Sequence, residues 1–376
     1  TWGDTPLVLN PWDEFAVAAA LQQQFDKRYV YWIRTDDGSR PAPYTIETEA
    51  APAAMPVFVG AGDMLAYGRY GVTADLGVGL WATAMPIDWD DDGDWDLLYS
   101  CQDKPQGGVY LYIQEAKNVF RQVKRLADGV WYCALADMNG DGEEDLLGGE
   151  QWWESVRDPA GWTRHDGPFK KPEGRIRAFL SRQVDWDGDG LLDLIRAAGD
   201  WEEYGWDRAF DETGNWTRGP LHGYLWFHRD TGTNASPVYA EGVRLEAADT
   251  PIDVYGNPGP SIADWDNDGD LDLLCGEFRD EFTYFENVGT RTNPRLGPPQ
   301  PAMTRDGRLT IDLCMMNPLP CDWNGDGRVD LVVGQEDGRV SVIINLGVTR
   351  GAPRFAGEFF LKEIDPPGKS GGLGTP

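Results

Sequence analysis

The sequence predicts an all-β fold built from a repeated unit, and three observations support this prediction. An acidic segment of eleven residues occurs five times, beginning at Asp88, Asp137, Asp185, Asp264 and Asp322. Two aliphatic residues follow the last acidic position of every copy, as expected for a short buried strand. Repeats of one supersecondary unit at regular intervals are typical of ring and array architectures. The chain of 376 residues is therefore expected to form a single ring, residues 1–376.

Each copy of the acidic segment reads Asp-x-[Asp/Asn]-x-Asp-Gly-x-x-Asp. Oxygen atoms at positions 1, 3 and 5 converge on one point when the chain turns tightly, and the glycine at position 6 permits that turn. Position 7 can add its backbone carbonyl oxygen. Calcium suits such a flexible, carboxylate-rich shell better than magnesium, which prefers a tight octahedron. One Asp/Asn/Gly run could be a simple turn, but five matching copies predict about five structural Ca²⁺ ions.

The repeats resemble those of the FG-GAP/VCBS family, the calcium-binding blade repeats of integrin α-subunit propellers and of many secreted bacterial proteins. The resemblance rests on the five loops and on the Asn-x-Gly endings at residues 285–290 and 344–347, and it covers roughly residues 81–361. It implies a β-propeller of four-stranded blades, in which each ion lies between the first and second strands of its blade.

Motif positions carry the family's calcium ligands over to this sequence, with position 7 contributing through its backbone. The implied ligands are Asp88, Asp90, Asp92, Asp94 and Asp96; Asp137, Asn139, Asp141, Glu143 and Asp145; Asp185, Asp187, Asp189, Leu191 and Asp193; Asp264, Asp266, Asp268, Asp270 and Asp272; and Asp322, Asn324, Asp326, Arg328 and Asp330.

Five marked blades and further strands near the N-terminus predict a seven-bladed propeller, with six blades as the alternative and a two-layer β-sandwich as a more distant one. Residues 1–80 lack the loop signature and are expected to hold one or two degenerate blades and a strand that closes the ring. Residues 81–361 hold the five calcium-loop blades, and residues 362–376, rich in Gly and Pro, form a tail. Strands of the first marked blade are expected at 83–87, 97–100, 109–113 and 120–126.

The intervals between loop starts are 49, 48, 79 and 58 residues, so the third interval carries an insertion. The excess lies at about residues 199–221, and such insertions in a regular scaffold often carry function. The calcium loops are expected on one face of the ring. The turns that follow the second strands then reach the opposite face, where a central opening can bind ligands.

Aromatic residues gather near that opposite face, and aromatic rings beside carboxylates are typical of carbohydrate sites. The candidate substrate-binding residues are Trp152, Trp153, Trp201, Tyr204, Trp206 and Tyr255. For any single tryptophan, packing between blades is the alternative explanation. The candidate catalytic residues are His165, His222, His228, Arg279, Glu150 and Glu277.

A polysaccharide lyase acting on uronate-containing glycans is the leading functional hypothesis. Arginine would neutralise the uronate carboxylate, while histidine or tyrosine would move protons. A glycoside hydrolase that uses Glu150 and Glu277 as its acid pair is one alternative. A non-catalytic lectin or adhesion propeller that binds a glycan or a protein partner is another, because the fold does not decide the function.

The composition restricts partners and location. A net charge of −30 disfavours nucleic acid and anionic membranes as partners. No apolar run approaches the roughly 18 residues needed to span a membrane. Because the sequence starts at Thr1 and calcium loops suit extracellular ion levels, we expect a secreted, periplasmic or cell-surface protein in its mature form. The five cysteines lack zinc spacing, with a Cys314–Cys321 disulfide as one option.

Overall fold

The computed structural model describes residues 28–31, 44–47, 73–77, 79–102, 107–130, 132–205, 210–349 and 351–364. The chain divides into two compact units, Thr1–Met64 and Leu65–Pro376. In the first unit, β1 (Arg28–Tyr31) pairs antiparallel with β2 (Tyr44–Glu47). The degenerate blades expected before residue 73 lie otherwise outside the described residues.

The described residues of the second unit contain five larger sheets, each built on four strands that pair antiparallel, and no helix occurs among them. The first sheet contains β4 (Thr83–Ile87), β5 (Asp96–Cys101), β6 (Gly108–Ala116) and β7 (Val119–Asp128). The second contains β8 (Cys133–Ala136), β9 (Asp145–Gly148), β10 (Gln151–Trp153) and β11 (Arg164–Asp166). The third contains β12 (Ile176–Val184), β13 (Asp193–Asp200), β14 (His222–His228) and β15 (Val243–Arg244), with β18 (Asp253–Val254) also paired to β14.

The remaining two sheets repeat the same order. The fourth contains β19 (Gly259–Ala263), β20 (Asp272–Gly276), β21 (Phe282–Phe285) and β22 (Gln300–Pro301). The fifth contains β24 (Asn317–Cys321), β25 (Asp330–Gly334), β26 (Val340–Ile343) and β29 (Phe359–Phe360). Two smaller sheets consist of β16 (Glu246–Ala247) with β17 (Thr250–Pro251), and of β23 (Met303–Thr304), β27 (Asn345–Thr349) and β28 (Ala352–Phe355). The four strands expected in the first marked blade are confirmed to within a few residues at their ends.

The first strands of the five sheets contact one another in a closed cycle: β4 with β8, β8 with β12, β12 with β19, β19 with β24, and β24 with β4. The last of these contacts includes a hydrogen bond of 2.5 Å from Asn317 Nδ2 to Thr83 Oγ1. No further sheet fits between the fifth and the first. Five sheets thus form the cycle in the described part of the chain, where seven or six blades were expected. Among the described residues of the second unit, one strand, Thr73–Asp75, precedes β4.

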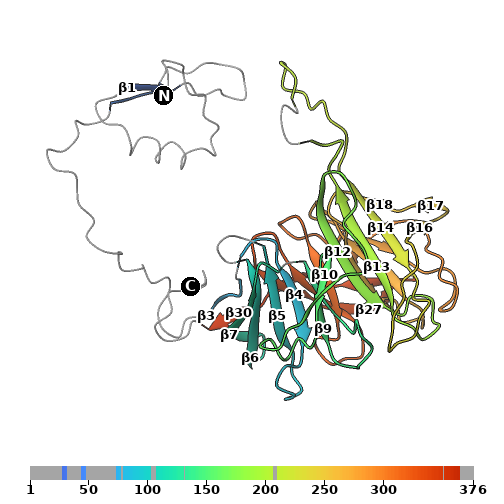
Figure 1. Ribbon diagram of the computed structural model, residues 1–376. Coiled ribbons are helices and arrows are strands. Elements are labelled where there is room, and N and C mark those ends of the chain that lie inside the picture. The colour runs from blue at the N-terminus through green and yellow to red at the C-terminus, as the bar shows by residue number, and fades with distance from the viewer. Residues whose placement is uncertain are drawn as a thin grey trace. The chain divides into compact units, whose positions relative to one another are not determined.

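The ring is closed by strands from both ends of the second unit. In the first sheet, β30 (Lys362–Ile364) lies parallel to β7, and β3 (Thr73–Asp75) pairs antiparallel with β30 (Figure 1). The Leu76 backbone N–H also donates to the Leu361 carbonyl over 2.9 Å. Residues 362–364, expected as the start of a tail, thus form a strand, and residues 365–376 lie outside the described residues.

The core lies between neighbouring sheets, in clusters of buried apolar side chains. Trp186 and Trp265, from the third and fourth acidic loops, are 4% and 1% exposed within these clusters. Packing between sheets is therefore the role of these two tryptophans. Strands β20 and β25 are buried along their whole length because sheets cover both of their faces.

All five cysteines are free thiols, so the Cys314–Cys321 disulfide is not formed. Among the described residues, no helix is long and apolar enough to cross a membrane.

Candidate functional site

The acidic loops connect the first and second strands of each sheet, as the repeat pattern predicts. In the first loop, Asp88 accepts hydrogen bonds of 3.1 Å from the backbone N–H groups of Asp92 and Gly93. In the fourth loop, Asp264 accepts the equivalent bonds, at 2.9 Å and 3.0 Å. Gly93 adopts a φ of 90°, in the left-handed region that favours glycine. The loop sequence therefore folds its own carboxylates inward.

The aspartate at position 9 holds each loop to the rest of its sheet. Asp272 is 1% exposed, accepts the Trp265 backbone N–H at 3.2 Å through Oδ2, and accepts the Asn287 backbone N–H at 2.7 Å through Oδ1. Asp96, Asp145, Asp193 and Asp330 accept the equivalent pairs of backbone bonds. This residue, predicted as a metal ligand, therefore also fixes the loop against the connection between the third and fourth strands.

Three loops bring carboxylate oxygens from positions 1, 3 and 9 within 4.8 Å of one another. These groups are Asp88, Asp90 and Asp96; Asp185, Asp187 and Asp193; and Asp264, Asp266 and Asp272. The other two loops carry Asn139 and Asn324 at position 3, so an amide oxygen replaces one carboxylate.

Several carboxylate oxygens of the acidic loops lack a hydrogen-bond partner within the protein. Among the described residues, buried Oδ1 atoms of Asp94, Asp185, Asp187, Asp266 and Asp270 have no hydrogen-bond partner. Burial raises the pKa of Asp272 to about 7 and the pKa values of Asp193, Asp266 and Asp330 to about 6. Buried oxygens of this kind are costly without a partner, and a hard divalent cation would satisfy those of Asp185, Asp187 and Asp266, which occupy positions 1 and 3 of their loops. The donor set therefore fits calcium.

The third loop has a feature that the sequence did not indicate. Arg229 Nε lies 2.9 Å from Asp187 Oδ2, and Arg229 NH2 lies 2.8 Å from Asp189 Oδ2. A guanidinium therefore pairs with two of the predicted ligands of this loop, whereas in the first loop Arg157 lies 3.9 Å from Asp91, which is not a predicted ligand. A cation in the third loop would share these two carboxylates with Arg229.

Each acidic loop is hydrogen-bonded to the next sheet around the ring. Arg157 of the second sheet donates to the Asp88 and Trp89 carbonyl oxygens of the first loop, both at 2.6 Å. Arg291 of the fourth sheet donates to the Asp185 and Trp186 carbonyl oxygens of the third loop, at 2.6 Å and 3.1 Å. Gln183, Asn345 and Asn118 make the remaining links to the second, fourth and fifth loops. The loops thus contribute to the contacts between sheets.

At the opposite end of the first strands, Arg177 lies over the centre of the ring. Its guanidinium carbon is 4.9 Å from the ring centroid of Trp81 and 4.4 Å from that of Trp201. Trp81 precedes β4 of the first sheet, whereas Arg177 and Trp201 belong to the third. Because these sheets are not neighbours in the cycle, the contact reaches across the axis.

Residues from other sheets complete this group, which we call the central cluster: Trp81, Gln102, Tyr132, Arg177, Trp201, Cys314 and Glu336. Trp81 Nε1 donates to Glu336 Oε1 over 3.4 Å, and Cys314 Sγ donates to Glu336 Oε2 over 2.6 Å. Gln102 Nε2 donates to the Tyr132 hydroxyl over 3.1 Å. Burial raises the pKa of Tyr132, against the opposing charge of Arg177, so its phenol stays protonated at neutral pH.

A row of aromatic rings extends from the central cluster into the insertion. The Trp201 ring centroid lies 5.1 Å from that of Phe278 and 5.5 Å from that of Tyr204. Tyr204 continues to Trp216 at 4.5 Å, and Trp216 continues to Phe210 at 5.3 Å. Exposure rises along the row, from 3% at Trp201 to 39% at Trp216 and 63% at Phe210. Two of the predicted aromatic residues, Trp201 and Tyr204, thus belong to one row.

Of the other predicted aromatic residues, Tyr255 lies beside this row, with its ring centroid 6.5 Å from that of Phe278, whereas Trp152 and Trp153 lie elsewhere. Trp153 packs between the first and second sheets. Trp152 packs against the buried apolar side chains that lie between the second and third sheets. Tyr255 lies beneath the guanidinium of Arg279, whose carbon is 4.0 Å from the ring centroid. Trp206 lies outside the described residues.

The three histidines occupy separate places. His222 begins β14, and its Nδ1 is 2.7 Å from Asp253 Oδ2, with Glu203 at 3.7 Å from its Nε2. Burial lowers the pKa of His222, but the hydrogen bond and charge of Asp253 outweigh this effect, so the pKa is raised overall. His222 pairs with Asp200, which directly precedes Trp201, so this histidine lies beside the aromatic row.

The other two histidines are held by structural contacts. His165 stacks on Trp152 at 4.2 Å and lies 2.9 Å from Glu154, on the outer strand β11. His228 ends β14, contacts the Phe169 ring and the Ala240 carbonyl oxygen, and has a pKa lowered to about 4 by burial. The three histidines are therefore not brought together, whereas Arg279 and His222 both lie beside the aromatic row that begins at Trp201.

The two predicted glutamates belong to different sheets. Glu150 accepts the Lys171 backbone N–H at 2.7 Å. Glu277 accepts the Tyr255 backbone N–H at 3.3 Å and the Thr283 hydroxyl, and burial raises its pKa. Among the described residues, no hydrogen bond or ion pair joins these two carboxylates.

Sequence analysis missed Trp81, Arg177, Cys314 and Glu336. A usable signal exists, because Trp81, Arg177 and Cys314 lie seven or eight residues before the first aspartate of the following acidic loop. That offset corresponds to the start of a first strand or the residues just before it. Counting back from each loop would have identified the residues around the central opening.

Comparison with known proteins agrees with the repeat pattern. Residues 88–148 match the model of an FG-GAP-like repeat. Eighteen solved chains match the structure. They include an endo-1,4-β-xylanase from Bacteroides thetaiotaomicron, with 10% identity and a TM-score of 0.47, over 78% of this chain and 100% of that chain. They also include an α-L-arabinanase from Penicillium chrysogenum in complex with arabinobiose, with 10% identity and a TM-score of 0.42, over 77% of this chain and 86% of that chain.

No curated protein matches the chain. The family match covers the first two acidic loops and the strands between them, which are two of the five loops on which the resemblance was based. Residues 88–148 are thus identified as an FG-GAP-like repeat.

Proposed function

We propose that this chain is an exported, calcium-stabilised propeller of five blades that binds a uronate-containing polysaccharide on the face opposite its acidic loops and cleaves it by β-elimination. The observation that carries the proposal is the position of Arg177, whose guanidinium contacts the rings of both Trp81 and Trp201, which belong to the first and third sheets.

An arginine guanidinium keeps its charge when it contacts aromatic rings, and its N–H donors lie in one plane. A carboxylate is the group that matches this planar donor pair. The protein carries a net charge of −30, so a polyanionic glycan needs a local cationic site to approach. Arg177 supplies that cation, and the partly exposed ring of Trp216 provides a surface on which a neighbouring sugar can stack.

His222 and Tyr224 are suited to the chemical step. Their rings stack with centroids 5.5 Å apart, and Asp253 fixes Nδ1 of His222. His222 Nε2 would remove the proton at C5 of the uronate, the bond from C4 to the leaving oxygen would break, and a C4–C5 double bond would form. Tyr224, whose pKa is raised by burial and which is therefore protonated, would return a proton to the leaving oxygen.

Non-catalytic binding is the second candidate, and the contacts of His222 favour it. Asp253 and Glu203 both stabilise the protonated imidazole, which cannot act as a base. Binding would then persist without product at mildly acidic pH. A hydrolase that uses Glu150 and Glu277 has less support, since both carboxylates accept hydrogen bonds within the scaffold.

The donor atoms of the acidic loops support calcium as the structural ion. Loops of this type act at extracellular calcium levels, so we propose a location outside the cytoplasm. In this proposal the ions stabilise the ring and take no part in the reaction at the opposite face.

The test is to incubate the calcium-loaded protein with polyuronates and, as a control, with neutral polysaccharides. Absorbance from the unsaturated uronate should appear only with the polyuronates. Arg177→Ala should abolish both binding and product, whereas His222→Ala should abolish product and keep binding. Arg308→Ala, a change at an exposed ion pair with Glu281, is the matched control and should change neither. The proposal fails if no polyuronate binds, or if Arg177→Ala binds as well as the unchanged protein.

A further inference from the structure

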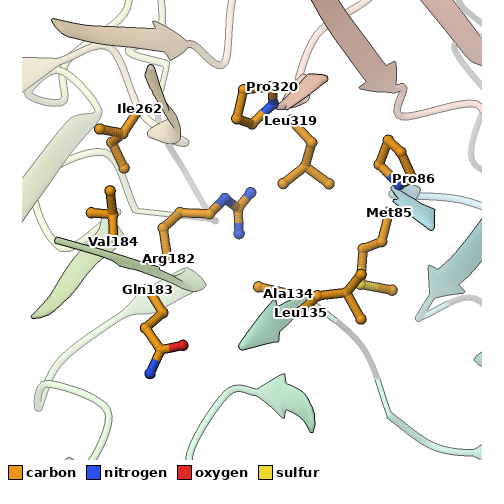
Figure 2. A pocket seen from close by; sticks show the side chains of 10 residues that line it. All are labelled: Met85, Pro86, Ala134, Leu135, Arg182, Gln183, Val184, Ile262, Leu319 and Pro320. Atoms are coloured by element: carbon orange, nitrogen blue, oxygen red, sulfur yellow. The ribbon is translucent and has the colours of Figure 1, made fainter. Parts of the chain in front are cut away.

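The centre of the ring contains a cavity of about 190 Å³ that plays no part in the proposed reaction. Residues from all five first strands line it (Figure 2). Arg182 and Arg177 both belong to β12, and five residues of strand separate their backbones by about 16 Å. The cavity therefore lies nearer the acidic loops than the central cluster does.

The lining is apolar apart from two side chains, Arg182 and Gln183. Gln183 is already engaged, because its Oε1 accepts the Asp137 backbone N–H at 2.6 Å and its Nε2 donates to the Asp137 carbonyl at 2.7 Å. Figure 2 shows the Arg182 side chain extending from β12 into the space between the other lining residues. The guanidinium is therefore the polar group that a ligand in this cavity would meet.

Arg182 is 5% exposed, and each of its hydrogen-bond acceptors is neutral. Nε donates to the Pro260 carbonyl at 3.1 Å, NH1 to the Ser181 carbonyl at 2.9 Å, and NH2 to the Asn317 Oδ1 atom at 2.5 Å. A guanidinium carries five N–H groups, so one N–H on each terminal nitrogen is left over.

No ion pair in the described part of the chain involves Arg182. Burial lowers the pKa of Arg182 to about 10, so the guanidinium remains charged at neutral pH. Its one neighbouring titratable group, the Cys133 thiol, has a pKa raised by burial to about 12 and is neutral. A buried charge without a counter-ion is unfavourable, and buried charges in proteins are normally paired.

We propose that the central cavity binds one small monovalent anion, which pairs with the two remaining N–H groups of Arg182. The volume accommodates a halide ion with water, or a small carboxylate such as formate. The apolar walls and the neutral partners of Arg182 favour a single negative charge over a divalent anion, which the lone guanidinium would leave half neutralised. The anion would act as a structural counter-ion that links three of the five first strands, β12, β24 and β4, through Arg182, Asn317 and Thr83.

The direct test uses crystals of the calcium-loaded protein soaked in bromide. An anomalous peak within hydrogen-bonding distance of the Arg182 terminal nitrogens supports a halide. In solution, the melting temperature is compared in chloride, formate and gluconate at equal ionic strength, because gluconate is too large for the cavity. An anion that binds the folded state raises the melting temperature. A bromide peak together with a higher melting temperature in chloride identifies a halide. A higher melting temperature in formate alone identifies a carboxylate.

Arg182→Met should remove the peak and make the melting temperature independent of the anion. Arg305→Met, at an exposed arginine, is the matched control and should keep the dependence. If Arg182→Met does not fold, the comparisons on the unchanged protein still decide the question. The proposal is wrong if the cavity shows no bromide and the melting temperatures in chloride, formate and gluconate coincide. Loss of uronate binding at Arg177 would leave this result unaffected, so the two proposals fail separately.

Discussion

Removing calcium should destabilise the protein much more at about pH 8 than at about pH 5. Burial raises the pKa of Asp272 from 3.8 to about 7, and those of Asp193 and Asp330 to about 6. Each of these pKa values is higher in the folded state than in the unfolded state. At a pH between the two values, the ion-free folded state therefore binds more protons than the unfolded state does. The free energy of unfolding must therefore fall as pH rises through this window. For Asp272 alone, a rise of about three pKa units corresponds to on the order of 4 kcal/mol.

The assay is urea unfolding followed by tryptophan fluorescence, in chelator and in calcium at both pH values. When a chelator removes calcium, the free energy of unfolding should be several kcal/mol lower at about pH 8 than at about pH 5. The reason is that deprotonated, desolvated carboxylates repel one another. Calcium should remove the difference by stabilising the carboxylates. Asp272→Asn should shrink the pH effect in chelator, whereas Asp306→Asn, at an exposed site outside the acidic loops, should not. A stability in chelator that is flat or rises over this range would refute the reasoning.

Three further outcomes follow from the contacts. Arg157→Met removes two hydrogen bonds to first-loop carbonyls, so calorimetry should show weaker calcium binding there and a stability loss of about 1 kcal/mol, while Arg305→Met should show neither. A reducing agent should leave the melting temperature unchanged because all five cysteines are free, and a decrease would reveal a disulfide. The rate of product formation should rise with pH as His222 loses its proton, and Asp253→Asn should move that rise to lower pH. A pH-independent rate would contradict the role of His222 as base.

The local parts of the fold could be predicted because each is encoded within a few residues. The spacing of aspartates and glycine determines the loop, and the aliphatic pair after it determines the buried second strand, as at Leu97 and Leu98. The number of sheets could not be predicted in the same way. It depends on the contact between β24 and β4, which joins residues more than 200 positions apart through pairs such as Asn317 and Thr83. Nothing in the local pattern at either residue indicates its partner.

The candidate site was predicted in part for the same reason. The position of Trp201 followed from the repeat register, which places the end of every second strand on one face. Arg177 was missed because its significance arises from a contact with Trp81 across the axis, not from a motif. The histidines were grouped because they are rare, yet His222 and His228 lie at opposite ends of one strand. Scarcity in the sequence does not indicate proximity in the fold.

The composition of the first sheet has a consequence for biosynthesis. Its edge contains β3 and β30, and the fifth sheet is completed by β29, so both sheets need residues 359–364. A ribosome that synthesises the chain from its N-terminus releases the second, third and fourth sheets well before these residues. Until residues 359–364 are synthesised, the nascent protein therefore remains an open arc. During that time the edge of β7 is unpaired and accessible to other chains. Chaperone protection of that edge would matter most during this interval.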